Sequence, residues 1–68
     1  MLALPGYSQK PLADEKFRLF RYGEAISLYT GYLQKKPGDA GALRNLAISC
    51  SKINDISGAV VAYRSLVK

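Results

Sequence analysis

The chain has 68 residues, a formal net charge of +5, one cysteine and no histidine. These counts exclude an intramolecular disulfide and the usual Cys/His zinc sites. A chain of this length buries only about 60% of the surface that its unfolded form exposes, so its stability has to come from good helix packing or from another chain.

The first half of the chain predicts two helices after a flexible lead, residues 1–7. A first helix is expected over about residues 8–20, where Pro11 is acceptable in the first turn. Its buried face is expected to hold Leu12, Ala13, Leu19 and Phe20. After a break near Arg21, a second helix is expected over about residues 22–36, with a buried face of Ala25, Ile26, Tyr29, Tyr32 and Leu33. Pro37 stops this helix because proline disfavours helical geometry in the residue before it.

The second half predicts two more helices, over about residues 40–53 and 56–68. Asp39 is a suitable N-cap for the third helix, and Asp55 is one for the fourth. Between these helices, Asn54 tolerates the left-handed conformation that commonly ends a helix. The third helix carries an apolar stripe at helical spacing: Leu43, Leu46, Ala47, Cys50 and Ile53. The stripe of the fourth is Ile56, Ala59, Val60, Tyr63, Leu66 and Val67.

The two halves align with each other when one is slid along the other. A single shift sets Ala13 over Ala47, Ala25 over Ala59 and Tyr29 over Tyr63. The shift is 34 residues, and a helical hairpin that recurs with this period resembles the tetratricopeptide repeat. The resemblance implies an all-α fold of two antiparallel helix–turn–helix repeats, residues 8–37 and 39–68, stacked as a short right-handed α-solenoid. The residues expected to pack between helices and repeats are Leu12, Ala13, Ala25, Tyr29, Leu46, Ala47, Ala59 and Tyr63.

Repeats of this kind do not bury their faces alone, and at least three are usually needed. With two repeats and no capping helix, the Ile56–Val67 stripe is expected to face water. Leaving four or five such side chains exposed forfeits roughly 1.5–3 kcal/mol each. The chain is therefore expected to be a piece of a longer array, or to form an oligomer that covers this end.

The resemblance also implies a concave groove, lined by the first helix of each pair, that holds a peptide or a partner helix. The residues off the core stripes of these helices are Lys10, Asp14, Phe17, Arg18, Arg44, Asn45, Ile48, Ser51 and Lys52. This set is mostly basic, so its guanidinium groups suit carboxylates and Asn45 suits a peptide backbone. Lys10, Arg44 and Asn45 are similar to the carboxylate clamp of some tetratricopeptide domains. A plainer interpretation is a solvated helix face with Lys10, Asp14 and Arg18 as a ladder of ion pairs.

The inventory of side chains favours a binding protein over an enzyme. No nucleophile–base pair, phosphate-cradling glycine loop or metal-ligand set stands out, so no catalytic residue, metal or cofactor is expected. Cys50 and the tyrosines at helical spacing are interpreted as packing residues.

We expect a scaffold that binds an acidic or amphipathic segment of a protein partner. The alternative is a helical-repeat module that binds RNA or another polyanion, which the charge favours. The scattered cations and the absence of an interleaved aromatic platform argue against nucleic acid. The longest apolar run, Ala59–Tyr63, is too short to insert into a membrane, and the unpaired cysteine favours the cytoplasm.

Overall fold

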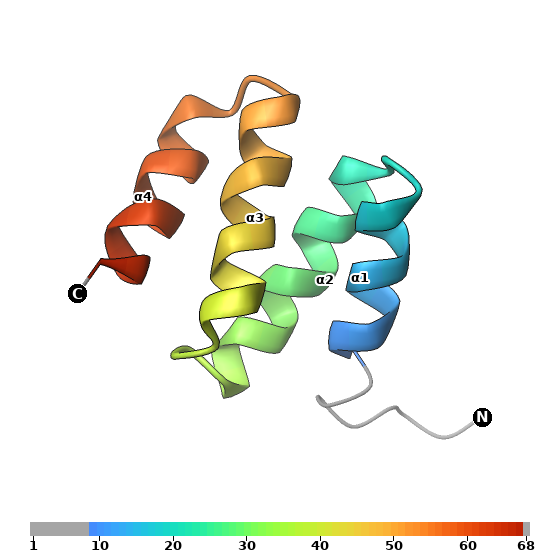
Figure 1. Ribbon diagram of the computed structural model, residues 1–68, viewed down its shortest axis with the longest axis horizontal. Helices are drawn as coiled ribbons and strands as arrows, with labels where there is room; N and C mark the ends of the chain where they lie inside the picture. Colours follow the sequence, from blue (N-terminus) through green and yellow to red (C-terminus); the bar gives the residue numbers. More distant parts are fainter. Residues whose placement is uncertain (1–8, 68) are drawn as a thin grey trace.

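In the computed structural model, which describes residues 9–67, the chain forms four α-helices and, within that range, no strand (Figure 1). They are α1 (Gln9–Arg18), α2 (Tyr22–Lys35), α3 (Ala40–Lys52) and α4 (Ile56–Leu66). The predicted all-α class is confirmed. The predicted lead over residues 1–7 and the last residue of the predicted fourth helix lie outside the described residues.

Two predicted N-caps hold the starts of the helices in the second half. The Asp39 carboxylate accepts a hydrogen bond from the backbone N–H of Ala42 at 3.1 Å, at the start of α3. The Asp55 carboxylate accepts one from the N–H of Gly58 at 3.0 Å, at the start of α4. Each carboxylate satisfies a backbone donor that the first turn of a helix leaves free, so both helices begin where the sequence predicts.

The turns after α1 and α3 have the same form. Phe20 and Asn54 occupy equivalent positions of the two halves and take left-handed backbone conformations, with φ of 63° and 64°. The N–H groups of the turn bond back to carbonyls of the last helical turn in the pattern of a Schellman motif. These bonds join Arg21 to Lys16 (2.8 Å) and Phe20 to Phe17 (3.0 Å) after α1, and Asp55 to Cys50 (2.8 Å) and Asn54 to Ser51 (3.1 Å) after α3. The two halves therefore turn in the same way at equivalent positions.

The Schellman turn also corrects the predicted core of the first helix. Because α1 ends at Arg18 and not near residue 20, Leu19 and Phe20 belong to the turn and are 47% and 75% exposed. Phe17, predicted to face the groove, is instead half-buried against the core. Its ring makes edge-on contacts with the rings of Tyr22 and Tyr29, with centroid distances of 6.0 and 6.5 Å.

The left-handed positions give a reciprocal pair of predictions. A bulky residue in this conformation costs about 1–2 kcal/mol, whereas asparagine visits it readily. The Phe20 ring is mostly exposed and touches Tyr22 at a centroid distance of 6.2 Å. We expect Phe20→Asn to raise the free energy of unfolding by about 0.5–1 kcal/mol, net of the lost ring contact. Asn54→Phe should lower it by about 1–2 kcal/mol. Urea unfolding checks both, and a destabilised Phe20→Asn protein would contradict the assignment.

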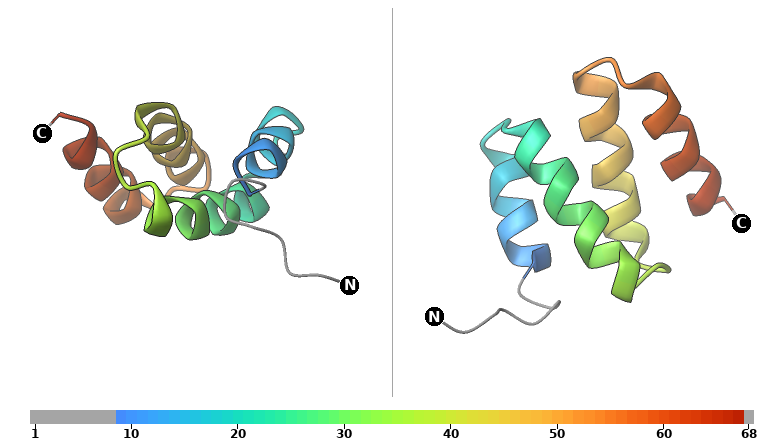
Figure 2. Two further views of the ribbon diagram at one scale, coloured as in Figure 1. Left: turned by 90° about the horizontal axis from the view of Figure 1, so that it is seen from below. Right: turned by 180° about the vertical axis from the view of Figure 1, so that it is seen from behind.

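Each helix packs on the next along the chain, and α1 also touches α3. In the described residues α2 and α4 make no contact with each other. Figure 2 shows the resulting arrangement, with α1 and α3 on one side of the molecule and α2 and α4 on the other. The α1 and α3 surfaces that carry the predicted groove residues therefore belong to one layer.

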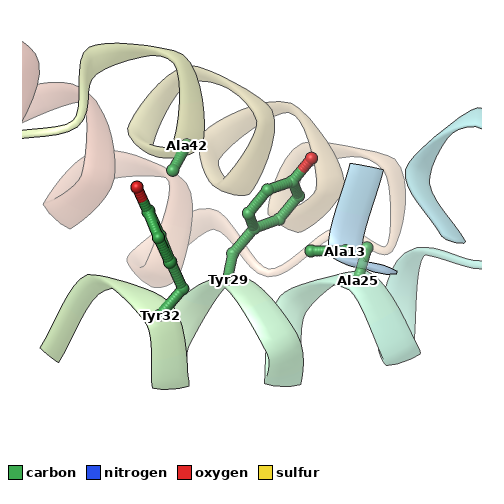
Figure 3. Packing of buried hydrophobic residues seen from close by; sticks show 5 residues of the cluster. All are labelled: Ala13, Ala25, Tyr29, Tyr32 and Ala42. Carbon is green, nitrogen blue, oxygen red and sulfur yellow. The ribbon is translucent and has the colours of Figure 1, made fainter. Parts of the chain in front are cut away.

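The core is built from alanines and two tyrosines. Ala13 of α1, Ala25, Tyr29 and Tyr32 of α2, and Ala42 of α3 form one buried cluster (Figure 3). Alanine lets helices approach closely, and the tyrosine rings fill the space between them. In the second half, the other buried residues are Leu43, Ala47, Ser49 and Cys50 on α3, and Ala59 and Ala62 on α4.

The set of residues predicted to pack between helices and repeats is only partly buried. Ala13, Ala25, Tyr29, Ala47 and Ala59 are buried and Leu46 is half-buried. Leu12 and Tyr63, in contrast, are 42% and 45% exposed, because no other helix of the described range covers these sides of α1 and α4. Ile53, predicted in the buried stripe of the third helix, is 49% exposed because it follows the last residue of α3.

Candidate partner-binding surfaces

One tyrosine hydroxyl links three helices through polar side chains. Tyr29 of α2 donates a hydrogen bond to the carboxylate of Asp14 on α1 and accepts one from Asn45 Nδ2 on α3 at 2.9 Å. Lys10 donates to the same carboxylate at 3.0 Å. Figure 3 shows the Tyr29 hydroxyl at the end of the ring remote from α2. Burial, followed by the bond to Asp14, raises the pKa of Tyr29 well above its ordinary value, and the bond from Asn45 acts in the opposite direction.

A second tyrosine ties α2 to the start of α3. The Tyr32 hydroxyl donates to Asp39 Oδ2 at 2.6 Å, while Oδ1 of the same carboxylate caps α3. The hydrogen bond to Asp39 is the main cause that raises the pKa of Tyr32, and it is also the main cause that lowers the pKa of Asp39. The loop between α2 and α3 is thereby held at a defined position, which fixes α3 beside α2.

The two tyrosines predict a loss of stability in alkali. An unfolded chain releases these protons near pH 10.0, whereas the fold holds them to higher pH because both pKa values are raised. Their contribution to stability is complete below pH 10 and is lost as the pH rises through the folded-state values. Tyr29→Phe removes one of the two hydroxyls, and with it part of the dependence of stability on pH. Urea unfolding at pH 8 and pH 11 should show a smaller loss for Tyr29→Phe than for the parent, and parallel losses would contradict the role of Tyr29.

The predicted groove residues fall into two groups. Lys10, Asp14 and Asn45 are brought together through Tyr29. On α3, Ile48 is half-buried, and Arg44, Ser51 and Lys52 are exposed. Arg18 is also exposed and pairs with Glu15, three residues before it, so the predicted ladder stops at the Lys10–Asp14 pair. Asp14 and Asn45 are engaged by Tyr29 within the fold, whereas Arg44, Ser51 and Lys52 of α3 are exposed.

Every acidic side chain of the protein is already engaged within the chain. Asp39 and Asp55 cap helices, and the other three form ion pairs. These pairs are Asp14 with Lys10, Glu15 with Arg18, and Glu24 with both Lys16 (3.5 Å) and Arg21 (3.0 Å). Within residues 9–67, the basic side chains that form no ion pair are Lys35, Lys36, Arg44, Lys52 and Arg64. The uncompensated surface charge is therefore positive.

A hollow that the sequence did not predict lies on the other side of the molecule. A groove of about 660 Å³ runs between α2 and α4 with α3 as its floor. Ile26 and Leu33 line it from α2, Leu43 and Leu46 from α3, and Val61 from α4. None of the predicted groove residues lines it. Its separate apolar residues come from three helices, so no single stripe in the sequence indicates it.

The groove holds little that could do chemistry. Cys50 lines its floor, and burial, together with the negative charge of Asp55, raises the pKa of the thiol. A thiol that holds its proton is a poor nucleophile, which agrees with packing as the role of Cys50. Among residues 9–67 there is no group of three histidine, cysteine or acidic side chains that could hold a metal ion.

No family model, no curated protein and no solved structure matches this chain. Over the part of the chain that the structure describes, no helix has the length and apolarity needed to cross a membrane.

Proposed function

We propose that this protein is a non-catalytic interaction module of the tetratricopeptide type. It would consist of two antiparallel hairpins, residues 8–37 and 39–68, stacked as a short right-handed solenoid that holds a segment of another polypeptide. Two features support the proposal. The end of α3 and the start of α4 fall at positions equivalent to the end of α1 and the start of α2, and the turns after α1 and α3 share one hydrogen-bond pattern.

The proposed ligand is an acidic or amphipathic segment that lies along the α1 and α3 surface. The observation that carries this proposal is the charge imbalance at α3. Arg44 and Lys52 are exposed, they form no ion pair within the described residues, and all five acids of the chain are engaged elsewhere. An arginine guanidinium can bind a carboxylate through two parallel hydrogen bonds, and Lys52 adds a second positive charge on the same helix.

Charge reversal tests the proposal. A fluorescein-labelled decapeptide of aspartate, glutamate and leucine serves as the probe, and anisotropy gives its dissociation constant. We expect Arg44→Glu with Lys52→Glu to weaken binding by tenfold or more, because hydrogen bonds to charged groups contribute about 1.5–3 kcal/mol each. The matched control is Lys35→Glu with Lys36→Glu, the same change of net charge at the end of α2. Equal losses of affinity in the two variants would show that the net charge of the protein alone attracts the peptide. That result would contradict a site on α3.

The second candidate function, binding of RNA or another polyanion, is favoured by the same uncompensated cations. A ten-nucleotide oligouridylate measured in the same assay separates the two functions. Nucleic-acid binding should weaken steeply and linearly in a plot of the logarithm of affinity against the logarithm of salt concentration, because phosphates release counterions. Tighter binding of the oligonucleotide than of the peptide, with that slope, would replace the first function by the second.

A further inference from the structure

The hollow between α2 and α4, which we call the α2–α4 groove, is bounded on three sides by helices of the described residues. Its walls, α2 and α4, make no contact with each other and leave the groove open above α3. The floor is a stripe along α3 that contains Leu43, Leu46 and Cys50. The volume of about 660 Å³ lies within the range of about 300–1,000 Å³ that is usual for ligand sites. The groove therefore has the size and the apolar floor of a binding site.

Both walls carry uncharged hydrogen-bonding groups at helical spacing. Thr30 and Gln34 line the groove from α2, and Ser57 and Ser65 line it from α4; all four are exposed. The Ser65 hydroxyl donates to the carbonyl of Val61 at 3.2 Å, and its oxygen can still accept a hydrogen bond. Side chains of these types supply donors and acceptors, which the backbone of an extended polypeptide requires in equal number. The walls therefore suit a polypeptide backbone.

A single charged side chain, that of Asp55, lines the groove. Its Oδ1 accepts a hydrogen bond from the N–H of Gly58 at 3.0 Å, and the exposed carboxylate forms no ion pair within residues 9–67. The backbone N–H of Asp55 bonds to the carbonyl of Cys50 at 2.8 Å, so the carboxylate lies at the Cys50 end of the floor. One end of the groove therefore carries a negative charge without a cation beside it, and the rest of the lining is neutral.

From this lining we infer that the α2–α4 groove binds an extended apolar segment of a partner polypeptide that carries one lysine or arginine at its end. The cation would meet Asp55, and the apolar side chains would lie on the stripe that runs from Cys50 to Leu43. That stripe is about 10 Å long, enough for about three residues of extended chain. The charge of Asp55 sets the direction of the segment in the groove.

A second copy of this chain offers no such segment in its described residues. Residues 9–67 form four helices joined by connections of three or four residues, so none of their apolar runs is an extended strand. The groove also differs from the α1 and α3 surface in the charge that it selects. None of Lys10, Arg44 and Lys52 lines the groove, and Asp55 would repel the acidic segment proposed for that surface. The two surfaces can therefore be tested with different peptides.

The test of the charge uses the full chain and two amidated hexapeptides of leucine, valine and alanine, one ending in lysine and one in glutamine. Each carries the uncharged fluorophore nitrobenzoxadiazole, and fluorescence titration gives its dissociation constant. We expect the lysine peptide to bind about two- to fivefold more tightly, as for an exposed ion pair. Asp55→Asn should abolish this preference, because asparagine caps a helix as well as aspartate does but has no charge. The matched control, Asp39→Asn, makes the same change of net charge at a cap outside the groove and should keep the preference.

The test of the apolar contact uses Val61→Gln, since Val61 lines the groove and is 62% exposed. We expect both peptides to bind about five- to tenfold more weakly, because the valine no longer covers apolar surface of the ligand. The matched control, Val60→Gln, is 45% exposed and lies outside the groove lining, so it should leave the affinity unchanged.

Four results would overturn the inference. They are an absence of saturable binding, equal losses in Val61→Gln and Val60→Gln, and a preference for the lysine peptide that survives in Asp55→Asn. The fourth is a concentration-dependent shift of the groove amides in ¹⁵N-labelled protein without peptide, which would identify a second copy as the occupant. Because neither peptide contains an acidic residue, these results do not depend on the acidic segment proposed for the α1 and α3 surface.

Discussion

Replacement of Tyr29 by alanine should unfold most of the protein at 25 °C. Among residues 9–67, Tyr29 has the largest fully buried side chain, and it reaches from α2 to both α1 and α3. Truncation of a buried aromatic residue to alanine costs about 3–5 kcal/mol, and here it also removes the partner of Asp14 and Asn45. A single hydrophobic core in a chain of this size rarely supplies more than about 3–5 kcal/mol of stability, so little or none would remain. The helical circular dichroism signal, followed in urea, measures the loss.

Two variants control the Tyr29→Ala experiment. Tyr63→Ala is the same change at the equivalent position of α4, and we expect it to cost at most about 1 kcal/mol because the Tyr63 ring is 45% exposed. Tyr29→Phe keeps the ring and removes only the hydroxyl, so it should cost about 1–3 kcal/mol. Equal costs for Tyr29→Ala and Tyr63→Ala would contradict the packing of α3 on α2.

We expect the second large loss of stability when Ala25 is replaced by a larger residue. Ala25 and Ala13 are both fully buried and lie beside each other where α1 meets α2 (Figure 3). Ala25→Leu adds a branched side chain at a fully buried position in the cluster that α1 and α2 share, so α1 has to move away from α2. We expect a loss of about 1–3 kcal/mol or more, measured by urea unfolding.

The matched control for Ala25→Leu is Ser27→Leu on the same helix. Ser27 is exposed, and leucine has the higher helix propensity, so this variant should be neutral within about 0.5 kcal/mol. If Ala25→Leu left stability unchanged, α1 and α2 could not be in close contact through their alanines.

Local signals were enough to predict where most helices begin and end. Asp39 and Asp55 act as the predicted caps, and Asn54 takes the predicted left-handed conformation. α1 ends earlier than the sequence predicts because Phe20 adopts a left-handed conformation that phenylalanine disfavours. Because α1 ends at Arg18, Leu19 lies in the turn and is exposed, while Phe17 lies in the last turn of the helix and packs on the core.

The surfaces were harder to predict than the helices, since they depend on how the helices lie against each other. The sequence predicts Asp14 and Asn45 as groove residues because they are polar and lie off the core stripe. Whether such side chains meet a ligand or a buried hydroxyl depends on Tyr29, which comes from a third helix. The groove between α2 and α4 likewise takes its walls from helices that do not touch, and no spacing along the chain reports that.

Mapping where an acidic polypeptide binds tests whether α1 and α3 form a polypeptide-binding surface. The aspartate, glutamate and leucine decapeptide is titrated into ¹⁵N-labelled protein, and the amide shifts are followed to saturation. We expect the largest shifts on one layer of the molecule, at Lys10 on α1 and at Arg44, Asn45 and Lys52 on α3. An absence of saturable shifts, or shifts centred on the ends of α2 and α4, would contradict a polypeptide-binding surface on α1 and α3.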